Sequence, residues 1–218
     1  MKKFIYHNSL SIVFFALFLV AICGQVFTGL RQYNAQREEK HVPPVSLNAY
    51  LSTGHFRQAT FENWESEFLQ MALFVILTIS LRQKGSSESK SCEVKEEVDR
   101  EPSPRRKGAP WPVRKGGVIL ALYKHSLSIA LLLLFVISFW FHFRGSLQDE
   151  NEQRLLLGQS PHTLSYYLDS SRFWFESFQN WQSEFLSVFA IVVLSVFLRQ
   201  KGSSQSKPVD APHSETGE

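Results

Sequence analysis

Glu67 and Glu184 occupy the same place in two copies of one short sequence, FENWESEFL at 61–69 and FQNWQSEFL at 178–186. Each copy leads directly into an apolar run. A carboxylate drawn into the hydrocarbon region of a bilayer is costly unless it meets a partner or water, and two like charges close together favour protonation of one. These two side chains could therefore hold a proton or a small cation.

The residues around the two glutamates separate into a polar and an aromatic side on a helix of 100° per residue. The polar side should face other helices, and the aromatic side should face lipid at the outer headgroups. Gln25 and His142 fall at equivalent positions on two other predicted helices. The candidate polar layer is Asn63, Glu67, Gln70, Asn180, Glu184, Ser187, Gln25 and His142. The candidate outer aromatic belt is Phe61, Trp64, Phe68, Phe178, Trp181 and Phe185.

The depth of the two glutamates follows from the length of the apolar runs that they precede. The runs 68–81 and 185–198 would each be ~21 Å long as helices, against a hydrocarbon core of ~30 Å. Residues before each run would then enter the outer leaflet. A second interpretation stays open, in which Thr60 or Asn63, and Ser177 or Asn180, cap the helices and the glutamates lie in the wet interface, favoured by the helix dipole.

The elements that must position these residues form an internal duplication. Residues 6–90 align with 123–207 at a constant offset of 117, without a gap and with 34 identities in 85 positions. Four apolar runs free of Asp, Glu, Lys and Arg lie at 10–27, 68–81, 127–143 and 185–198. This pattern predicts an all-α membrane protein with four transmembrane helices, arranged as two tandem parallel-repeat hairpins. The helices are expected at about 7–29, 62–82, 122–144 and 179–199.

The domain organisation follows from the same alignment. The first repeat is 1–84, the second is 118–201, and the loops 30–60 and 147–177 are polar with a short helix near 47–51. Residues 85–117 are rich in Ser, Glu, Lys and Pro and bury too little apolar surface to offset their ordering entropy. We expect a disordered linker there and a disordered tail at 202–218. The first apolar run is a retained helix, because its counterpart at 123–129 is internal.

The distribution of Lys and Arg predicts the orientation. The N-terminus, the stretch 82–124 and the C-terminal end carry sixteen, whereas the loops 30–60 and 144–177 carry seven. The more basic segments lie in the cytoplasm, so both termini should be cytoplasmic. Cations at the ends of the second and fourth helices suit both the helix C-terminus and the headgroups. These predicted anchors are Arg82, Lys84, Arg199 and Lys201.

Motifs of catalysis are missing from the sequence. It has no phosphate-binding glycine loop, no His-Glu-x-x-His, no Cys-x-x-Cys and no nucleophile elbow, so we expect neither an enzyme nor a metal or cofactor. The basic residues at 105–107 and 114–115 lack an aromatic platform and a nucleic-acid module. They favour attraction to anionic lipid rather than nucleic acid. The expected partners are the bilayer, a second copy of the chain or another membrane protein.

Three stretches carry a resemblance to a known family. They are YLSTGHF at 50–56, NWESEFLQ at 63–70 and GSSESK at 85–90. The chain resembles a family of small bacterial integral membrane proteins that is catalogued only as a domain of unknown function. The resemblance covers both repeats and implies the bacterial inner membrane. It implies no activity.

Two classes of function are compatible with these patterns. The first is a non-enzymatic membrane scaffold or interaction partner. The alternative is a small transporter or channel for protons or a small cation, built on the polar layer of Glu67 and Glu184. A transporter needs a connected polar path, whereas the inner halves of the four predicted helices are nearly pure Leu, Ile, Val and Phe. That composition favours the scaffold.

Overall fold

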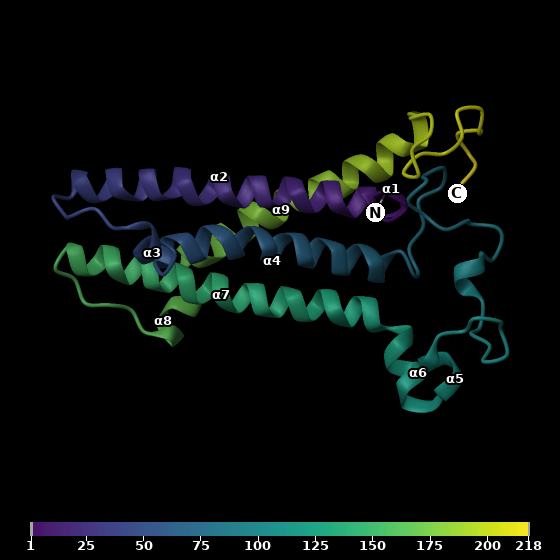
Figure 1. The fold of residues 1–218 in the computed structure, drawn as a ribbon, viewed down its shortest axis with the longest axis horizontal. Helices are drawn as coiled ribbons and strands as arrows, with labels where there is room; N and C mark the ends of the chain where they lie inside the picture. Colours follow the sequence, from purple (N-terminus) through teal and green to yellow (C-terminus); the bar gives the residue numbers. More distant parts are fainter. Residues whose placement is uncertain (1, 218) are drawn as a thin grey trace. The chain divides into compact units, whose positions relative to one another are not determined.

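The computed structural model describes residues 2–217, and in this range it contains helices and connecting turns without a strand (Figure 1). The predicted all-helical architecture is confirmed. Three helices, α2, α7 and α9, are long and apolar enough to cross a membrane. The α-helices are α1 (Lys2–His7), α2 (Ser9–Glu39), α3 (Leu47–Tyr50), α4 (Gly54–Leu77), α5 (Trp111–Lys115), α6 (Gly117–Lys124), α7 (Ser126–Leu156), α8 (Leu164–Leu168) and α9 (Ser171–Phe197).

The four long helices extend further into polar sequence than predicted. Helix α2 continues to Glu39 rather than 29, and α7 continues to Leu156 rather than 144. Helix α4 begins at Gly54 rather than 62, and α9 begins at Ser171 rather than 179. In α2 and α7 the added residues are mainly good helix formers, such as the run QREE at 36–39, so no hydrophobic environment is needed to continue these helices.

This extension removes the predicted helix caps. Thr60 and Asn63 lie inside α4, and Ser177 and Asn180 lie inside α9. The interpretation in which these residues begin their helices is wrong. The glutamates that follow them are therefore mid-helix residues, whose backbone N–H groups already have helical partners.

The chain divides into two compact units, and the first contains residues 2–61 and 141–173. In it α2 and α7 end in the same way, with a left-handed residue after the last turn: His41 at φ 57° and Gly158 at φ 70°. An asparagine on each helix then holds the returning chain. The side-chain amide of Asn34 bonds the backbone of Val45, and that of Asn151 bonds the backbone of His162.

The short helices of the first unit begin with hydroxyl caps. Ser46 accepts a hydrogen bond from Ala49 N before α3, and Thr163 accepts one from Tyr166 N before α8. Each helix then buries one tyrosine, Tyr50 or Tyr167. Helix α3 lies within the short helix predicted near 47–51.

The first unit also contains a close backbone approach between α4 and α7. A Cβ atom placed on Gly145 would lie 2.6 Å from the backbone nitrogen of Gln58, and one on Gly54 would collide with the backbone of Asp149. Only a residue without a side chain fits at either point. The two glycines thus fix how near the start of α4 comes to the end of α7.

The second unit contains residues 62–140 and 174–217. Its helices α4 and α9 are closed by arginines: one guanidinium nitrogen of Arg82 donates to the carbonyls of Thr78 and Ile79. Arg199 repeats this arrangement with the carbonyls of Ser195 and Val196. These bonds satisfy carbonyl groups that a helix end leaves without partners.

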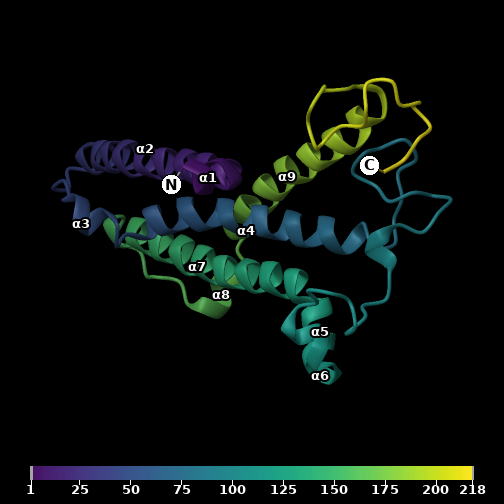
Figure 2. The same ribbon diagram turned by 45° about the vertical axis from the view of Figure 1, so that its right-hand side comes forward.

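The segment 85–117 of the second unit consists of turns, a 3₁₀ helix (η1, Glu97–Asp99) and α5 (Figure 2). The C-terminal segment lies against its beginning, where Gly85 N donates to Thr216 Oγ1 and Gly217 N donates to Ser86 O. The buried ammonium group of Lys207 donates to three backbone carbonyls, of Pro212, His213 and Glu215. Disorder in the linker and tail stays a prediction.

Candidate functional site

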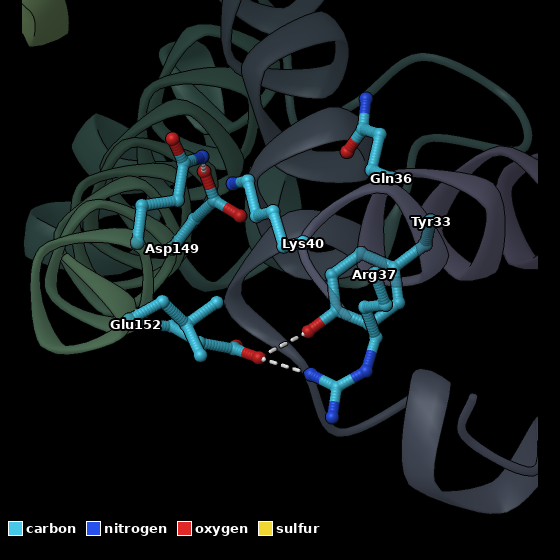
Figure 3. Close-up of a pocket in the computed structure, with 8 residues that line it drawn as sticks. Tyr33, Gln36, Arg37, Lys40, Asp149 and Glu152 are labelled. Atoms are coloured by element: carbon cyan, nitrogen blue, oxygen red, sulfur yellow. Dashed lines mark hydrogen bonds and ion pairs between the residues drawn. The ribbon is translucent and has the colours of Figure 1, made fainter. Parts of the chain in front are cut away.

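A partly buried polar cluster in the first unit joins α2 to the end of α7 (Figure 3). One carboxylate oxygen of Glu152 accepts a hydrogen bond from Tyr33 Oη at 2.5 Å and another from Arg37 at 2.9 Å. Tyr33 is buried, and the side chains of Arg37 and Glu152 are 17% and 32% exposed. Because Arg37 and Glu152 are 115 residues apart in the sequence, the Glu152 cluster joins two distant parts of the chain.

Each member of the Glu152 cluster is held by further contacts. The guanidinium carbon of Arg37 lies 5.6 Å from the centre of the Tyr33 ring, and its Nε donates to the carbonyl of Pro43. The Tyr33 ring packs against His55 and Tyr50, with ring centres 5.3 and 5.6 Å apart. Burial raises the pKa of the Tyr50 phenol, so this group stays neutral at physiological pH. The packing leaves the cluster little freedom to move.

The cavity beside the cluster is small. It has a volume of about 20 Å³ and is lined by Tyr33, Gln36, Arg37, Lys40, Asp149, Glu152, Gln153 and Leu156. A single water molecule needs about 10–15 Å³ measured in this way. The cavity can therefore hold a water molecule but no organic substrate.

A second ionic group in the same unit joins α9 to α7. Arg172 donates to Asp149 and to Glu150, at 2.6 Å in both cases, and also to Gln58 at 3.3 Å. Asp149 is 4% exposed and accepts a further bond from Gln153. Each charge here faces an opposite charge, which is how proteins accommodate buried ions. The arrangement suits a structural clamp.

The predicted polar layer falls in both units. In the first unit, Gln25 donates to Thr60 Oγ1 at 3.2 Å, and the fully buried His142 packs on Phe173 with ring centres 5.0 Å apart. The other six residues belong to the second unit. There Asn180 and Ser187 bond carbonyls of their own helix, those of Glu176 and Glu184.

The two predicted glutamates lie on α4 and α9. Glu67 is exposed and Glu184 is partly exposed, while Asn63 is exposed and Gln70 partly buried. Both glutamates belong to the second unit. Whether they bind a proton or a cation stays a prediction.

The fully buried carboxylate of the repeated sequence is Glu65, two residues before Glu67. Trp181 donates its indole N–H to Glu65 Oε1 at 3.0 Å, within the second unit. The polar edge of the Trp181 ring therefore faces α4, where Glu65 lies. The adjoining Ser66 is also buried and donates to the carbonyl of Asn63.

The other predicted aromatic residues divide by repeat. Phe178 and Phe185 in the second copy are exposed, as a lipid-facing belt requires, whereas Phe61, Trp64 and Phe68 in the first are partly buried. Phe61 stacks on Phe141, with ring centres 4.9 Å apart. Of the predicted anchors, Arg82 and Arg199 close their helices, and Lys84 and Lys201 are exposed.

Sequence reasoning missed the Glu152 cluster because it treated 30–60 and 147–177 as loops. A signal was present, since Leu30, Asn34 and Arg37 are identical in the second copy as Leu147, Asn151 and Arg154. This spacing of four and then three residues is that of one helix face. For Glu65, the second copy has Gln182, which keeps a polar side chain at the position.

The all-helical fold contains three helices long and apolar enough to span a bilayer, a pattern typical of the class of helical membrane proteins. The particular chain belongs to the family described as Domain of unknown function (DUF6766), whose model matches residues 1–218. No curated protein and no solved structure matches the chain.

Proposed function

We propose that this protein is a non-enzymatic integral membrane protein that acts as a scaffold or interaction partner for other membrane components. The proposal rests on one observation, the pairing of charged side chains with one another in the first unit. Arg37 pairs with Glu152, and Arg172 pairs with Asp149 and Glu150. The cavity beside them has room for water alone. Such a site holds helices together and has no place for a reacting molecule.

The membrane arrangement is part of the proposal. We infer four crossings, with α4 as the fourth, in two tandem parallel hairpins whose termini are cytoplasmic, in a bacterial inner membrane. The repeated local contacts support a duplication. Bonds of Asn34, Ser46 and Gln83 recur 117 residues later, at Asn151, Thr163 and Gln200. The excess of Lys and Arg in the proposed cytoplasmic segments supports the orientation.

The scaffold is tested by purifying the full-length protein from its native membrane in a mild detergent and weighing the intact complex by native mass spectrometry. We expect a defined complex with a second copy or with another membrane protein at fixed stoichiometry. A protein that remains a monomer in native nanodiscs excised without detergent would contradict the proposal.

The alternative is passage of a proton or a small cation, and one observation favours it. Glu65 is a fully buried carboxylate on α4, and intramembrane ionisable groups often mark ion pathways. Reconstituted vesicles with a pH-sensitive dye inside test this directly. Proton flux above that of empty vesicles, abolished by Glu65→Gln and retained by Trp181→Phe, would establish transport. Equal flux in protein-containing and empty vesicles would reject it.

A further inference from the structure

Two short helices, α5 and α6, precede α7 and carry exposed apolar side chains. Trp111 on α5 is 59% exposed, and on α6 Val118 is 76% and Leu122 57% exposed. Val118 and Leu122 are four residues apart, so they share one face of α6. Trp111 is thus exposed in the predicted linker 85–117, and Val118 and Leu122 are exposed at the start of the second repeat.

The same segment is strongly basic. Residues 102–124 contain six Lys and Arg and no Asp or Glu. Lys124 makes a surface ion pair with Glu101 at 3.3 Å, which leaves five cations: Arg105, Arg106, Lys107, Arg114 and Lys115. Anionic headgroups attract such juxtamembrane clusters.

Chain geometry keeps these helices beside the end of α7. Gly116 and Gly117 have φ values of 72° and 57°, a conformation that favours glycine and forms an elbow between α5 and α6. Helix α6 ends at Lys124, and α7 begins at Ser126 after a single residue. Figures 1 and 2 show α6 turned away from the line of α7. If α7 crosses the bilayer, α6 lies where α7 reaches the membrane surface.

We propose that α5 and α6 form an interfacial anchor that binds anionic phospholipid headgroups at the membrane face where α7 begins. Trp111, Val118 and Leu122 enter the boundary between headgroups and acyl chains, and the five cations contact the headgroup phosphates. Interfacial helices combine these two contributions, apolar insertion and electrostatic attraction. The proposal rests on the membrane crossing of α7, and it adds a lipid preference that the scaffold function does not require.

The test places a spin label on the full-length protein in nanodiscs. In a Cys23→Ser, Cys92→Ser background, Val118→Cys carries the label on α6. Leu133→Cys, 57% exposed on α7, serves as the control for the crossing, and Val209→Cys in the tail serves as the aqueous control. Collisions with oxygen report lipid, and collisions with a water-soluble nickel chelate report solvent. The nanodiscs contain phosphatidylcholine alone or mixed with phosphatidylglycerol.

We expect the label at 118 to be in lipid when phosphatidylglycerol is present. Replacing Arg105, Arg106, Lys107, Arg114 and Lys115 by glutamine should raise its nickel accessibility about tenfold, and high salt should act in the same direction. If the label at 118 were exposed to solvent while the label at 133 was in lipid, the proposed anchor would be wrong but the membrane crossing of α7 would stand. If the nickel accessibility of the label at 118 changed neither with lipid charge nor with the five substitutions, the proposed specificity for anionic headgroups would be wrong. A label at 133 outside lipid would reject the membrane crossing itself.

Discussion

Trp181 donates its indole N–H to the carboxylate of Glu65 at 3.0 Å, and the two residues come from different copies of the same repeated sequence. The acceptor has no exposed surface. A buried hydrogen bond of this kind has its largest effect when one partner is removed and the other stays, because the remaining group is left desolvated and unpaired.

Glu65→Ala should therefore lower the free energy of unfolding by about 1–3 kcal/mol. Glu65→Gln should cost less, since its amide oxygen can still accept from Trp181. Thermal unfolding in detergent measures both. The matched control is Glu67→Gln, which changes an exposed carboxylate on the same helix and should leave the melting temperature nearly unchanged. Equal losses at 65 and 67 would mean that the buried bond contributes nothing specific.

Glu152→Gln should weaken the contact between the repeats. The substitution removes the negative charge that faces Arg37 and accepts from Tyr33. Because the Glu152 side chain is 32% exposed, solvent screening limits the expected loss to about 1–2 kcal/mol. Glu38→Gln, which alters an exposed charge near the end of α2, should have little effect on the same unfolding curve. If Glu38→Gln lowered the free energy of unfolding as much as Glu152→Gln, the effect would come from surface charge in general and not from the Glu152 cluster.

Gly145→Ala should destabilise the first unit, because the added methyl would lie 2.6 Å from the backbone nitrogen of Gln58 and force α4 and α7 apart. We expect a loss of about 1–3 kcal/mol from this overpacking. Gly24→Ala provides the control, since a methyl group added there would have no atom of a neighbouring residue within 4 Å and alanine favours a helix. It should unfold at the same temperature as the parent or a higher one.

The proposed orientation predicts which thiols react from outside. In spheroplasts, a membrane-impermeant maleimide should leave the native Cys92 unlabelled until the membrane is permeabilised. A cysteine introduced as His41→Cys in a Cys92→Ser background should react at once, since position 41 lies in the turn after α2. Labelling of Cys92 in intact spheroplasts would reverse the assigned topology.

The apolar runs predicted the number and order of the long helices, because residues that avoid water over fourteen or more positions leave few alternatives to a helix. They predicted the helix ends poorly. The extended part of α2 contains polar side chains such as Arg37, whose partner Glu152 is remote in sequence. Periodicity reports which side of a helix is apolar, and it cannot report which distant residue completes a polar pair.

The prediction for the polar layer shows the same limit. A helical wheel separates Glu67 from Trp64 by angle alone, and it placed Trp181 on the lipid side. In the structure Trp181 bonds the buried Glu65, since an indole ring offers both a wide apolar surface and one donor. The angular position of a tryptophan on its helix does not determine whether its apolar surface or its N–H donor makes the contact.

The Glu152 cluster is one-sided. At the offset of 117, Arg37 corresponds to Arg154 and Glu152 corresponds to Ala35, so the second copy of this pair would have no carboxylate. Two identical hairpins meeting as a symmetric homodimer would form the contact twice or not at all. When both halves are on one polypeptide, each can acquire substitutions that fit it to the other. The two halves are then always produced in equal amounts, whatever the expression level.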